Sequence, residues 1–383
     1  NGTYQPTTGW AINNFYHTNV SDSVIFRSEN GDSSQVILQS FGSAFGLSRS
    51  KNVTFSKVTF ALANSGTAIT LTDSTANINF LNCVFNLPLT QGTSITHSGK
   101  ACVNTVIKNC KFYGGQFGIN LSGTATEIVD GITIQNCTMD SVEEKGVSIT
   151  YSKNISIRNN SITGFQYGFS ALNLQSCNNG FVIDKNKLMT DKGENVFYLS
   201  GCQDTLGVGS VVSNNFISSR TSYTTITQCV HLFNCIGIKM IHNSILCDID
   251  AAIRIYQNDT LKYPMHTFQN NIVCNLRNNV LINWGMPANA STYYLDRVFK
   301  DIGYNAYYNA PGNQGYYPYL FFSGGDFEDW KGYYPSDSTS VFANPQFTSY
   351  LDYQLTPNTS NIRINNKGKF LSGFSTDMDG VVR

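Results

Sequence analysis

Three ionisable side chains occupy the same place in successive strand-like segments in the middle of the chain. Tyr198, His231 and Arg254 each stand between two apolar residues, so in an extended segment each points away from the face that its neighbours share. A polysaccharide lyase needs a base that takes the proton beside a uronate carboxylate, and a cation or metal that stabilises the enolate. Tyr198, His231 and Arg254 are therefore the candidate catalytic residues, as acid, base and cation. Ligand contact without chemistry is the interpretation we prefer for this row, and an ordinary polar surface is the third alternative.

Neutral polar residues hold this strand position in the preceding segments. They are Thr70, Asn120, Ser148 and Asn173. Asn173 precedes Tyr198 in this row, and Tyr256 lies two residues beyond Arg254, so both are predicted to contact a ligand. The stretch between Tyr198 and His231 includes an insertion, and the prediction depends on their alignment.

Glycoside hydrolysis would instead need a pair of carboxylates. The nearest pairs are Asp248 with Asp250 and Asp377 with Asp379. If extended, each pair points to one face, and carboxylate oxygens of this kind also bind Ca²⁺. Asp248 and Asp250 are therefore candidate Ca²⁺ ligands, with a structural or solvated role as the alternative. Ca²⁺ is the one cofactor that the sequence suggests, because the cysteines and histidines lack the spacing of a zinc site.

A repeat along most of the chain must position these residues. Its pattern, apolar-x-apolar-x-x-Asn-x-apolar, is clearest in residues 155–162, and its sixth position recurs every 23 to 29 residues. That position holds Val58, Cys83, Cys110, Cys137, Asn160, Asn186, Asn215, Asn243 and Asn271. A repeat of this length indicates a solenoid.

Each copy of the repeat is accompanied by a second short segment of alternating apolar and polar residues. Short strands without helical periodicity predict an all-β fold, a right-handed parallel β-helix of about ten coils, with regular coils over residues 1–283. The repeated asparagines are predicted to point inward at a turn and to form a ladder with the next coil, because unpaired buried amides are costly.

The ten cysteines include Cys83, Cys110 and Cys137 at one repeat position. Stacked side chains have parallel Cα–Cβ bonds, which is a poor geometry for a disulfide. We predict buried free thiols that pack as small hydrophobic groups. One or more disulfides are the alternative, so the cysteines say little about the redox compartment.

The composition changes after residue 283. Residues 284–383 lack the regular repeat, and they are rich in tyrosine up to about residue 350. A β-helix end exposes unpaired strand edges, so these residues are predicted to form the last coils and a cap. The alternative is a stacking surface for sugar rings, in which Tyr316, Tyr317 and Trp330 contact the ligand.

Composition narrows the class of partner. Charged residues make up 13% of the chain, about half of the usual share of roughly 25%, and the formal net charge is zero. No basic field is present to hold nucleic acid, and no apolar run approaches the roughly 20 residues that span a bilayer. We therefore expect neither a nucleic-acid partner nor membrane insertion.

Several short motifs in the second half of the chain occur in a recognisable order. They are residues 303–308 (Gly-Tyr-Asn-Ala-Tyr-Tyr), 327–330 (Phe-Glu-Asp-Trp), 343–347 (Ala-Asn-Pro-Gln-Phe), 352–355 (Asp-Tyr-Gln-Leu) and 377–383 (Asp-Met-Asp-Gly-Val-Val-Arg). With these motifs the chain resembles secreted right-handed β-helix proteins of the pectate-lyase-like superfamily, especially large bacterial surface proteins. It departs from them at Asn344, where the family commonly has Asp before the proline.

The resemblance implies a secreted or cell-surface location and, for many such proteins, export by type IX secretion. It also implies further domains in the same exported chain and contact with the secretion machinery. Residues 1–4 (Asn-Gly-Thr-Tyr) look like the Pro-Gly-Thr-Tyr that follows a first strand in the family. From this we expect a processed or excised piece whose N-terminal cap strand is missing.

Two functions follow from these observations. The preferred prediction is a non-catalytic surface module, a rigid display, adhesion or carbohydrate-binding domain whose partner is a polysaccharide or glycan surface. Sparse ionisable groups and many neutral hydrogen-bonding side chains support it. The alternative is an enzyme, a polysaccharide lyase or a glycoside hydrolase, because this scaffold hosts several activities.

Overall fold

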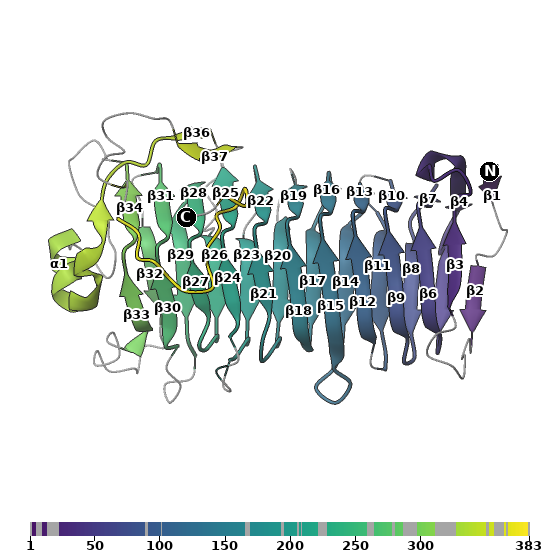
Figure 1. The fold of residues 1–383 in the computed structure, drawn as a ribbon, viewed down its shortest axis with the longest axis horizontal. Coiled ribbons are helices and arrows are strands. Elements are labelled where there is room, and N and C mark those ends of the chain that lie inside the picture. Colours follow the sequence, from purple (N-terminus) through teal and green to yellow (C-terminus); the bar gives the residue numbers. More distant parts are fainter. Residues whose placement is uncertain are drawn as a thin grey trace. The chain divides into compact units, whose positions relative to one another are not determined.

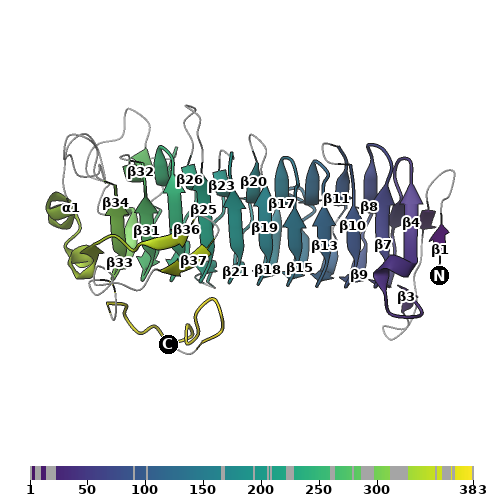
Figure 2. The same cartoon turned by 90° about the horizontal axis from the view of Figure 1, so that it is seen from above.

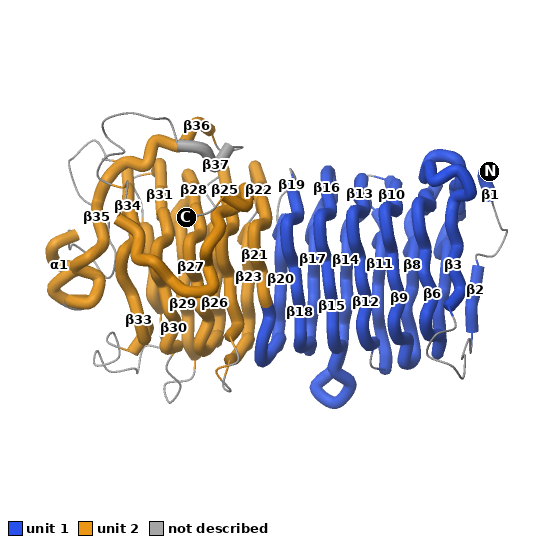
Figure 3. The backbone as a smooth tube through the Cα atoms, viewed as in Figure 1, with its two compact units in different colours: residues 1–181 blue, residues 182–383 orange. Residues whose placement is uncertain are grey.

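Short β-strands joined by turns make up most of the chain (Figure 1, Figure 2). The computed structural model describes residues 2–4, 10–13, 23–88, 91–100, 102–164, 169–192, 195–204, 207, 209–220, 228–258, 264–277, 280–285, 297–310, 327–349, 352–355, 364 and 367–381. The chain divides into two compact units, residues 1–181 and residues 182–383 (Figure 3). Each unit is described by itself.

In unit 1, residues 1–181, every coil contributes one strand to each of three parallel sheets. Sheet A contains β1 (Gly2–Tyr4), β4 (Val36–Ser40), β7 (Thr59–Leu62), β10 (Val84–Asn86), β13 (Lys111–Tyr113), β16 (Thr138–Asp140) and β19 (Ser161–Gly164). Sheet B contains β2 (Trp10–Asn13), β5 (Phe45–Ser48), β8 (Thr67–Thr72), β11 (Thr93–Ser98), β14 (Phe117–Ser122), β17 (Lys145–Thr150) and β20 (Ser170–Gln175). Sheet C contains β3 (Val24–Arg27), β6 (Lys51–Ser56), β9 (Ala76–Leu81), β12 (Val103–Lys108), β15 (Val129–Gln135) and β18 (Ser152–Arg158). A short 3₁₀ helix, η1 (Ser33–Gln35), precedes β4.

Unit 2, residues 182–383, repeats the arrangement. Sheet A contains β22 (Lys187–Thr190), β25 (Phe216–Arg220), β28 (Ser244–Asp248), β31 (Ile272–Asn275), β34 (Ala306–Asn309) and β35 (Val341–Phe342). Sheet B contains β23 (Asn195–Ser200), β26 (Gln228–Phe233), β29 (Ala251–Tyr256) and β32 (Val280–Gly285). Sheet C contains β21 (Val182–Asp184), β24 (Val211–Ser213), β27 (Lys239–Ile241), β30 (His266–Gln269) and β33 (Phe299–Gly303). The remaining elements are α1 (Phe327–Tyr333), η3 (Pro335–Thr339) and the antiparallel pair β36 (Phe347–Ser349) and β37 (Asp352–Leu355).

Residues one repeat apart pair in parallel register, which confirms the predicted all-β parallel β-helix. Ile132 pairs with Ile155 and Ile134 with Ile157, so the apolar positions of the repeat stack on one another. Phenylalanines follow the same rule: Phe60, Phe85 and Phe112 stack with ring centroids 5.0 and 4.7 Å apart. Each fully buried phenylalanine contributes about 1.5–3 kcal/mol relative to an exposed one. The core therefore lies inside the coils.

The predicted asparagine ladder is present in unit 2. The Nδ2 atom of Asn215 donates to Oδ1 of Asn243 at 2.9 Å, and Nδ2 of Asn243 donates to Oδ1 of Asn271 at 3.0 Å. Each side chain also bonds backbone groups; Asn243 Nδ2, for example, donates to the Val212 carbonyl at 2.9 Å. Because every amide has partners, the buried polar row stabilises the turn that leads from sheet C into sheet A.

All ten cysteines are buried and free. Cys83, Cys110 and Cys137 stack in unit 1 where the ladder stands in unit 2, and the Cys83 N–H donates to Sγ of Cys110 at 3.4 Å. The interpretation as small buried thiols is therefore confirmed, and the disulfide alternative is not.

Some of the described aromatic residues after residue 284 pack together beside the last described coil, and we call this cluster the cap: Tyr307, Phe327, Trp330, Tyr334 and Phe342. Strand β35 pairs with β34, and α1 and η3 follow. Asp337 is fully buried and accepts hydrogen bonds from Tyr307 Oη at 3.0 Å and Trp330 Nε1 at 2.6 Å. It also accepts one from Nδ2 of Asn305, the last ladder asparagine, at 3.4 Å, and one from Oγ of Ser340. One carboxylate thus joins the end of the ladder to the cap. None of the described helices is long and apolar enough to cross a membrane.

Candidate functional site

The structure places the three predicted catalytic residues side by side on sheet B of unit 2. Tyr198 of β23 pairs in register with His231 of β26, and His231 pairs with Arg254 of β29. The insertion between Tyr198 and His231 therefore lies in the connection and leaves the strand alignment intact. Asn283 of β32 continues the row.

These side chains form one continuous group on the outward face of the sheet. Val230 and Leu232 point inward and are buried, whereas His231 and Phe233 are partly exposed. The His231 ring lies 5.1 Å from the Tyr198 ring and 6.0 Å from the Phe233 ring, measured between centroids. Strand alternation thus places the outward side chains in two adjacent columns. One column contains Tyr198, His231 and Arg254, and the other contains Phe233 and Tyr256.

Tyr256 completes the group. Its ring stacks on Phe233 with centroids 5.6 Å apart and planes inclined by 4°, and Cζ of Arg254 lies 5.5 Å from its centroid. Gly285 of the next strand leaves room for this ring, because a Cβ there would lie 2.5 Å from the Tyr256 ring. We call Tyr198, His231, Phe233, Arg254 and Tyr256 the aromatic strip. Phe233 was absent from the sequence prediction, although it lies two residues after His231 and the strand alternation would have revealed it.

In the strip a neutral imidazole lies beside a cation that has no ion pair with any described residue. Burial first, and the Arg254 guanidinium second, lower the pKa of His231 to about 4. No described residue forms an ion pair with Arg254, and its buried Nε has no hydrogen-bond partner among the described residues. Nε2 of His231 is also buried and has no hydrogen-bond partner among the described residues. Unmet polar atoms of this kind each cost about 1–3 kcal/mol.

Two of the predicted ligand-contact residues outside the strip, Asn173 and Trp330, are buried, whereas the side chains of the strip are partly exposed. Asn173 pairs in register with Ser148 on unit 1, as predicted, but it is only 6% exposed and its Oδ1 accepts a hydrogen bond from Gln175. Trp330 is 2% exposed, and its indole N–H is bonded to Asp337. Its burial speaks against sugar stacking, because no face of the ring is open to a ligand. Tyr316 and Tyr317 lie outside the described residues.

Two of the four candidate carboxylates, Asp250 and Asp377, already have protein partners, and Ca²⁺ binding by Asp248 and Asp250 stays a prediction. Asp248 ends β28, and Asp250 forms an ion pair of 3.5 Å with Arg277. Asp377 Oδ1 accepts the backbone N–H groups of Asp379 and Val381, which closes a tight turn. Among the described residues, no group of three or more histidine, cysteine, aspartate or glutamate side chains is placed to hold a metal.

The aromatic strip can therefore do two things. The exposed parts of its aromatic rings can make apolar contacts with sugars, and Arg254 can bind a carboxylate. The neutral imidazole can accept or donate one hydrogen bond at Nε2 once a ligand displaces the side chains that cover it.

Comparisons with known proteins add little to this geometry. No family model matches the chain, and no curated protein matches it. Among solved structures, the chain is similar to the crystal structure of the Dettilon tailspike protein (gp208), with 13% sequence identity and a TM-score of 0.34. The match covers 74% of this chain and 61% of that chain.

Proposed function

We propose that unit 2 binds an acidic polysaccharide on its aromatic strip, as a carbohydrate-contacting module of a secreted or surface-exposed protein. One observation carries the proposal: Arg254 has no carboxylate partner among the described residues, although its guanidinium lies over the Tyr256 ring and it is in register with His231 on the neighbouring strand. A sugar acid would supply the missing anion, and its ring would contact Phe233 and Tyr256.

Arg254 is the single cation of the strip, so it would hold one carboxylate of a linear acidic polysaccharide, while the neighbouring sugars contact the aromatic side chains and the imidazole. The strip follows successive strands, which lie about 4.8 Å apart, close to the rise of one sugar unit in an extended chain. A linear polyuronate laid across β23, β26 and β29 would therefore present successive rings to successive strands. Recognition would rest on stacking and one charge-assisted bond, as expected for reversible adhesion.

Binding is tested with polygalacturonate by affinity electrophoresis and calorimetry, with its methyl-esterified, uncharged form as the matched ligand. Arg254→Gln is expected to weaken binding about tenfold to a hundredfold, because a hydrogen bond between charged groups contributes about 1.5–3 kcal/mol. Arg158→Gln removes one positive charge from β18 of unit 1 and is the control. Equal affinity for the charged and the esterified polymer, or an unchanged affinity of Arg254→Gln, would contradict the proposal.

Polysaccharide lyase activity is the second candidate, and the neutral state of His231 favours it. At neutral pH its imidazole can take the C5 proton of a uronate whose carboxylate is held by Arg254, while the C4–O4 bond breaks and Tyr198 protonates the leaving oxygen. A pKa of about 4 makes this imidazole a weak base, since efficient bases have a pKa near the working pH. Because His231 is a weak base, we prefer polysaccharide binding to lyase activity as the function of the strip.

The lyase is tested by the near-ultraviolet absorbance of unsaturated products released from polygalacturonate. Activity that disappears in His231→Gln, with binding retained, would establish the base. No absorbance change with the wild-type protein, or an unchanged rate in His231→Gln, would exclude this role for His231.

A further inference from the structure

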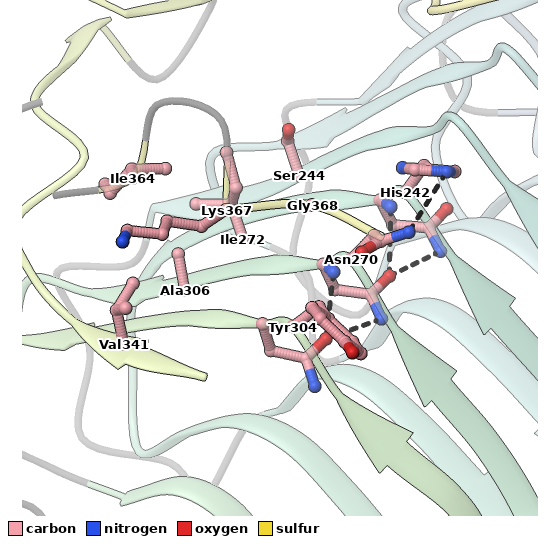
Figure 4. Close-up of a pocket in the computed structure, with 13 residues that line it drawn as sticks. His242, Ser244, Asn270, Ile272, Tyr304, Ala306, Val341, Ile364, Lys367 and Gly368 are labelled. Carbon is pink, nitrogen blue, oxygen red and sulfur yellow. Dashed lines mark hydrogen bonds between the residues drawn. The ribbon is translucent and has the colours of Figure 1, made fainter. Parts of the chain in front are cut away.

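A pocket of about 270 Å³ lies in unit 2, apart from the aromatic strip (Figure 4). His242, Asn270 and Tyr304 come from three successive turns between sheet C and sheet A, and Lys367 and Gly368 come from the C-terminal segment that crosses these turns. No residue of the strip lines this pocket. It is therefore a second, separate candidate site.

Two turn residues of the pocket differ from the residue type that the repeat usually has at this position. The residue before each inward Asn or Cys has a left-handed backbone, and it is usually asparagine, for example Asn109 and Asn214 with φ of 55° and 56°. Asparagine tolerates this conformation better than a residue with a large ring does. Yet His242 and Tyr304 both adopt φ of 59°, one on each side of Asn270. Two rings are thus held in a conformation that the repeat otherwise assigns mostly to asparagine.

The C-terminal segment is fastened over these turns. Nδ2 of Asn270 donates to the Lys369 carbonyl, and the Lys369 N–H donates to Oδ1 of Asn270, both at 2.8 Å. Nζ of Lys369 lies 5.6 Å from the Tyr304 ring centroid, and the Phe374 ring lies 6.1 Å from that of His242. The wall that Lys367 and Gly368 provide is therefore fixed relative to the turns.

The chemistry of the lining is that of a site for a small anion with an apolar face. Figure 4 shows His242, Asn270 and Tyr304 along one wall, and Ile272, Ala306, Val341 and Ile364 gathered with Lys367 along the other. Lys367 is charged, and none of the lining residues carries a carboxylate. Nδ2 of Asn270 lies 3.3 Å from Nε2 of His242, and an amide nitrogen can only donate, so Nε2 acts as the acceptor in this contact.

We propose that this pocket binds a single sugar acid, with the carboxylate on Lys367, one ring face on Ile272 and Ala306, and hydroxyl groups toward His242 and Tyr304. The pocket is smaller than the roughly 300–1,000 Å³ of sites for drug-sized ligands, so it suits one ring and not an oligosaccharide. Because the bound sugar touches both the coils and the C-terminal segment, its binding stabilises the attachment of that segment.

The test uses the full chain with D-glucuronate, with D-glucose as the uncharged ligand of the same ring and cyclohexanecarboxylate as the anion without hydroxyl groups. Calorimetry measures affinity, and thermal denaturation measures stabilisation. Glucuronate is expected to bind and to raise the melting temperature, and the other two compounds are not. Lys367→Met is expected to weaken binding about tenfold or more, since a charge-assisted hydrogen bond is lost. Lys300→Met, on the exposed part of β33, should leave affinity unchanged.

A second variant separates a ligand role from a purely structural one. His242→Asn restores the residue that the repeat prefers at this turn, so the ligand-free melting temperature is expected to stay the same or rise while the affinity for glucuronate falls. A lower ligand-free melting temperature with unchanged affinity would show that the ring only anchors Phe374 and would overturn the assignment. So would glucose or cyclohexanecarboxylate binding as tightly as glucuronate, unchanged affinity in Lys367→Met, or no binding to the wild-type protein. Arg254→Gln should bind glucuronate normally, which separates this site from the aromatic strip.

Discussion

Buried histidines show how single residues of this fold respond to pH. His266 is 1% exposed, and its Nδ1 accepts the Ile238 N–H at 3.2 Å. Burial lowers its pKa from 6.5 to about 3. His97, also buried, approaches the carbonyls of Ser122 and Lys100 at 3.1 and 2.9 Å. These contacts favour the charged ring, although burial outweighs them and lowers its pKa. At neutral pH the His266 side chain is therefore held in the neutral form.

The His266 pKa predicts loss of stability in acid. Above pH 6.5 the ring is neutral in both the folded and the unfolded chain; below it only the unfolded chain takes up the proton, until the pH reaches about 3. The free energy of unfolding should therefore fall in this window by about 1.4 kcal/mol per pH unit from this residue. Urea denaturation between pH 7 and pH 4 measures the slope. His266→Gln should flatten it, and an identical slope in this variant would contradict the assignment.

At the scale of elements, the last asparagine of the ladder needs a hydrogen-bond acceptor, because no further asparagine follows it in the described ladder. Asp337 is this acceptor. Its two carboxylate oxygens accept hydrogen bonds from the ladder, from Ser340 and from the side chains of Tyr307 and Trp330. Burial raises its pKa while these hydrogen bonds oppose the shift. The element that closes the solenoid is therefore held by a polar centre within an aromatic layer.

Replacing this centre should loosen the last coil. Asp337→Asn keeps the size of the side chain but turns one acceptor into a donor, which then faces donors that it cannot satisfy. We expect a loss of about 1–3 kcal/mol for each donor left unmet. Thermal denaturation with near-ultraviolet circular dichroism, which reports on Trp330 and Tyr307, measures the effect. The exposed Asp329→Asn in α1 is the control, and equal stability of the two variants would contradict the role of Asp337.

The sequence predicts those elements whose side chains repeat, and little else. Stacked asparagines, cysteines and the row of Tyr198, His231 and Arg254 all follow from one period and from strand alternation. Trp330 could not be predicted in this way, because its burial depends on a contact with Asp337 across an irregular turn. The pocket depends on residues such as Asn270 and Lys369, 99 positions apart, whose contact no periodicity encodes.

At the scale of the whole molecule, the cysteines report on opening of the coils. All ten are buried, and burial raises the pKa of Cys229 and Cys274 well above the usual range for a thiol. Thiolate is the reactive form, so both exposure and ionisation are suppressed. A solenoid whose coils contact only their neighbours can open from one region without the rest.

Thiol labelling should therefore be slow in the native protein and complete after unfolding. A disulfide reagent added under native conditions is expected to modify none of the ten thiols rapidly, and all ten in guanidinium chloride. Intermediate denaturant concentrations followed by mass spectrometry would show which coils open first. Rapid modification of any cysteine in the native protein would contradict its burial.

Register makes one coil of unit 1 removable. Deleting residues 83–109 would bring β13 beside β7, and Phe112 would then stack on Phe60 in place of Phe85. We expect this variant to fold, with an unchanged far-ultraviolet spectrum per residue and a cooperative melting transition. Deletion of residues 83–96 removes half a coil, misaligns every later strand and should prevent folding. If both deletions behave alike, stacking register does not govern folding.

The shared register also means that unit 1 can vary in length only by discrete amounts. Each coil gained or lost changes its extent along the stacking direction by about 4.8 Å and requires no new kind of contact. The length of this unit along the stacking direction can therefore change only in steps of one coil, by duplication or deletion of about 26 residues at a time.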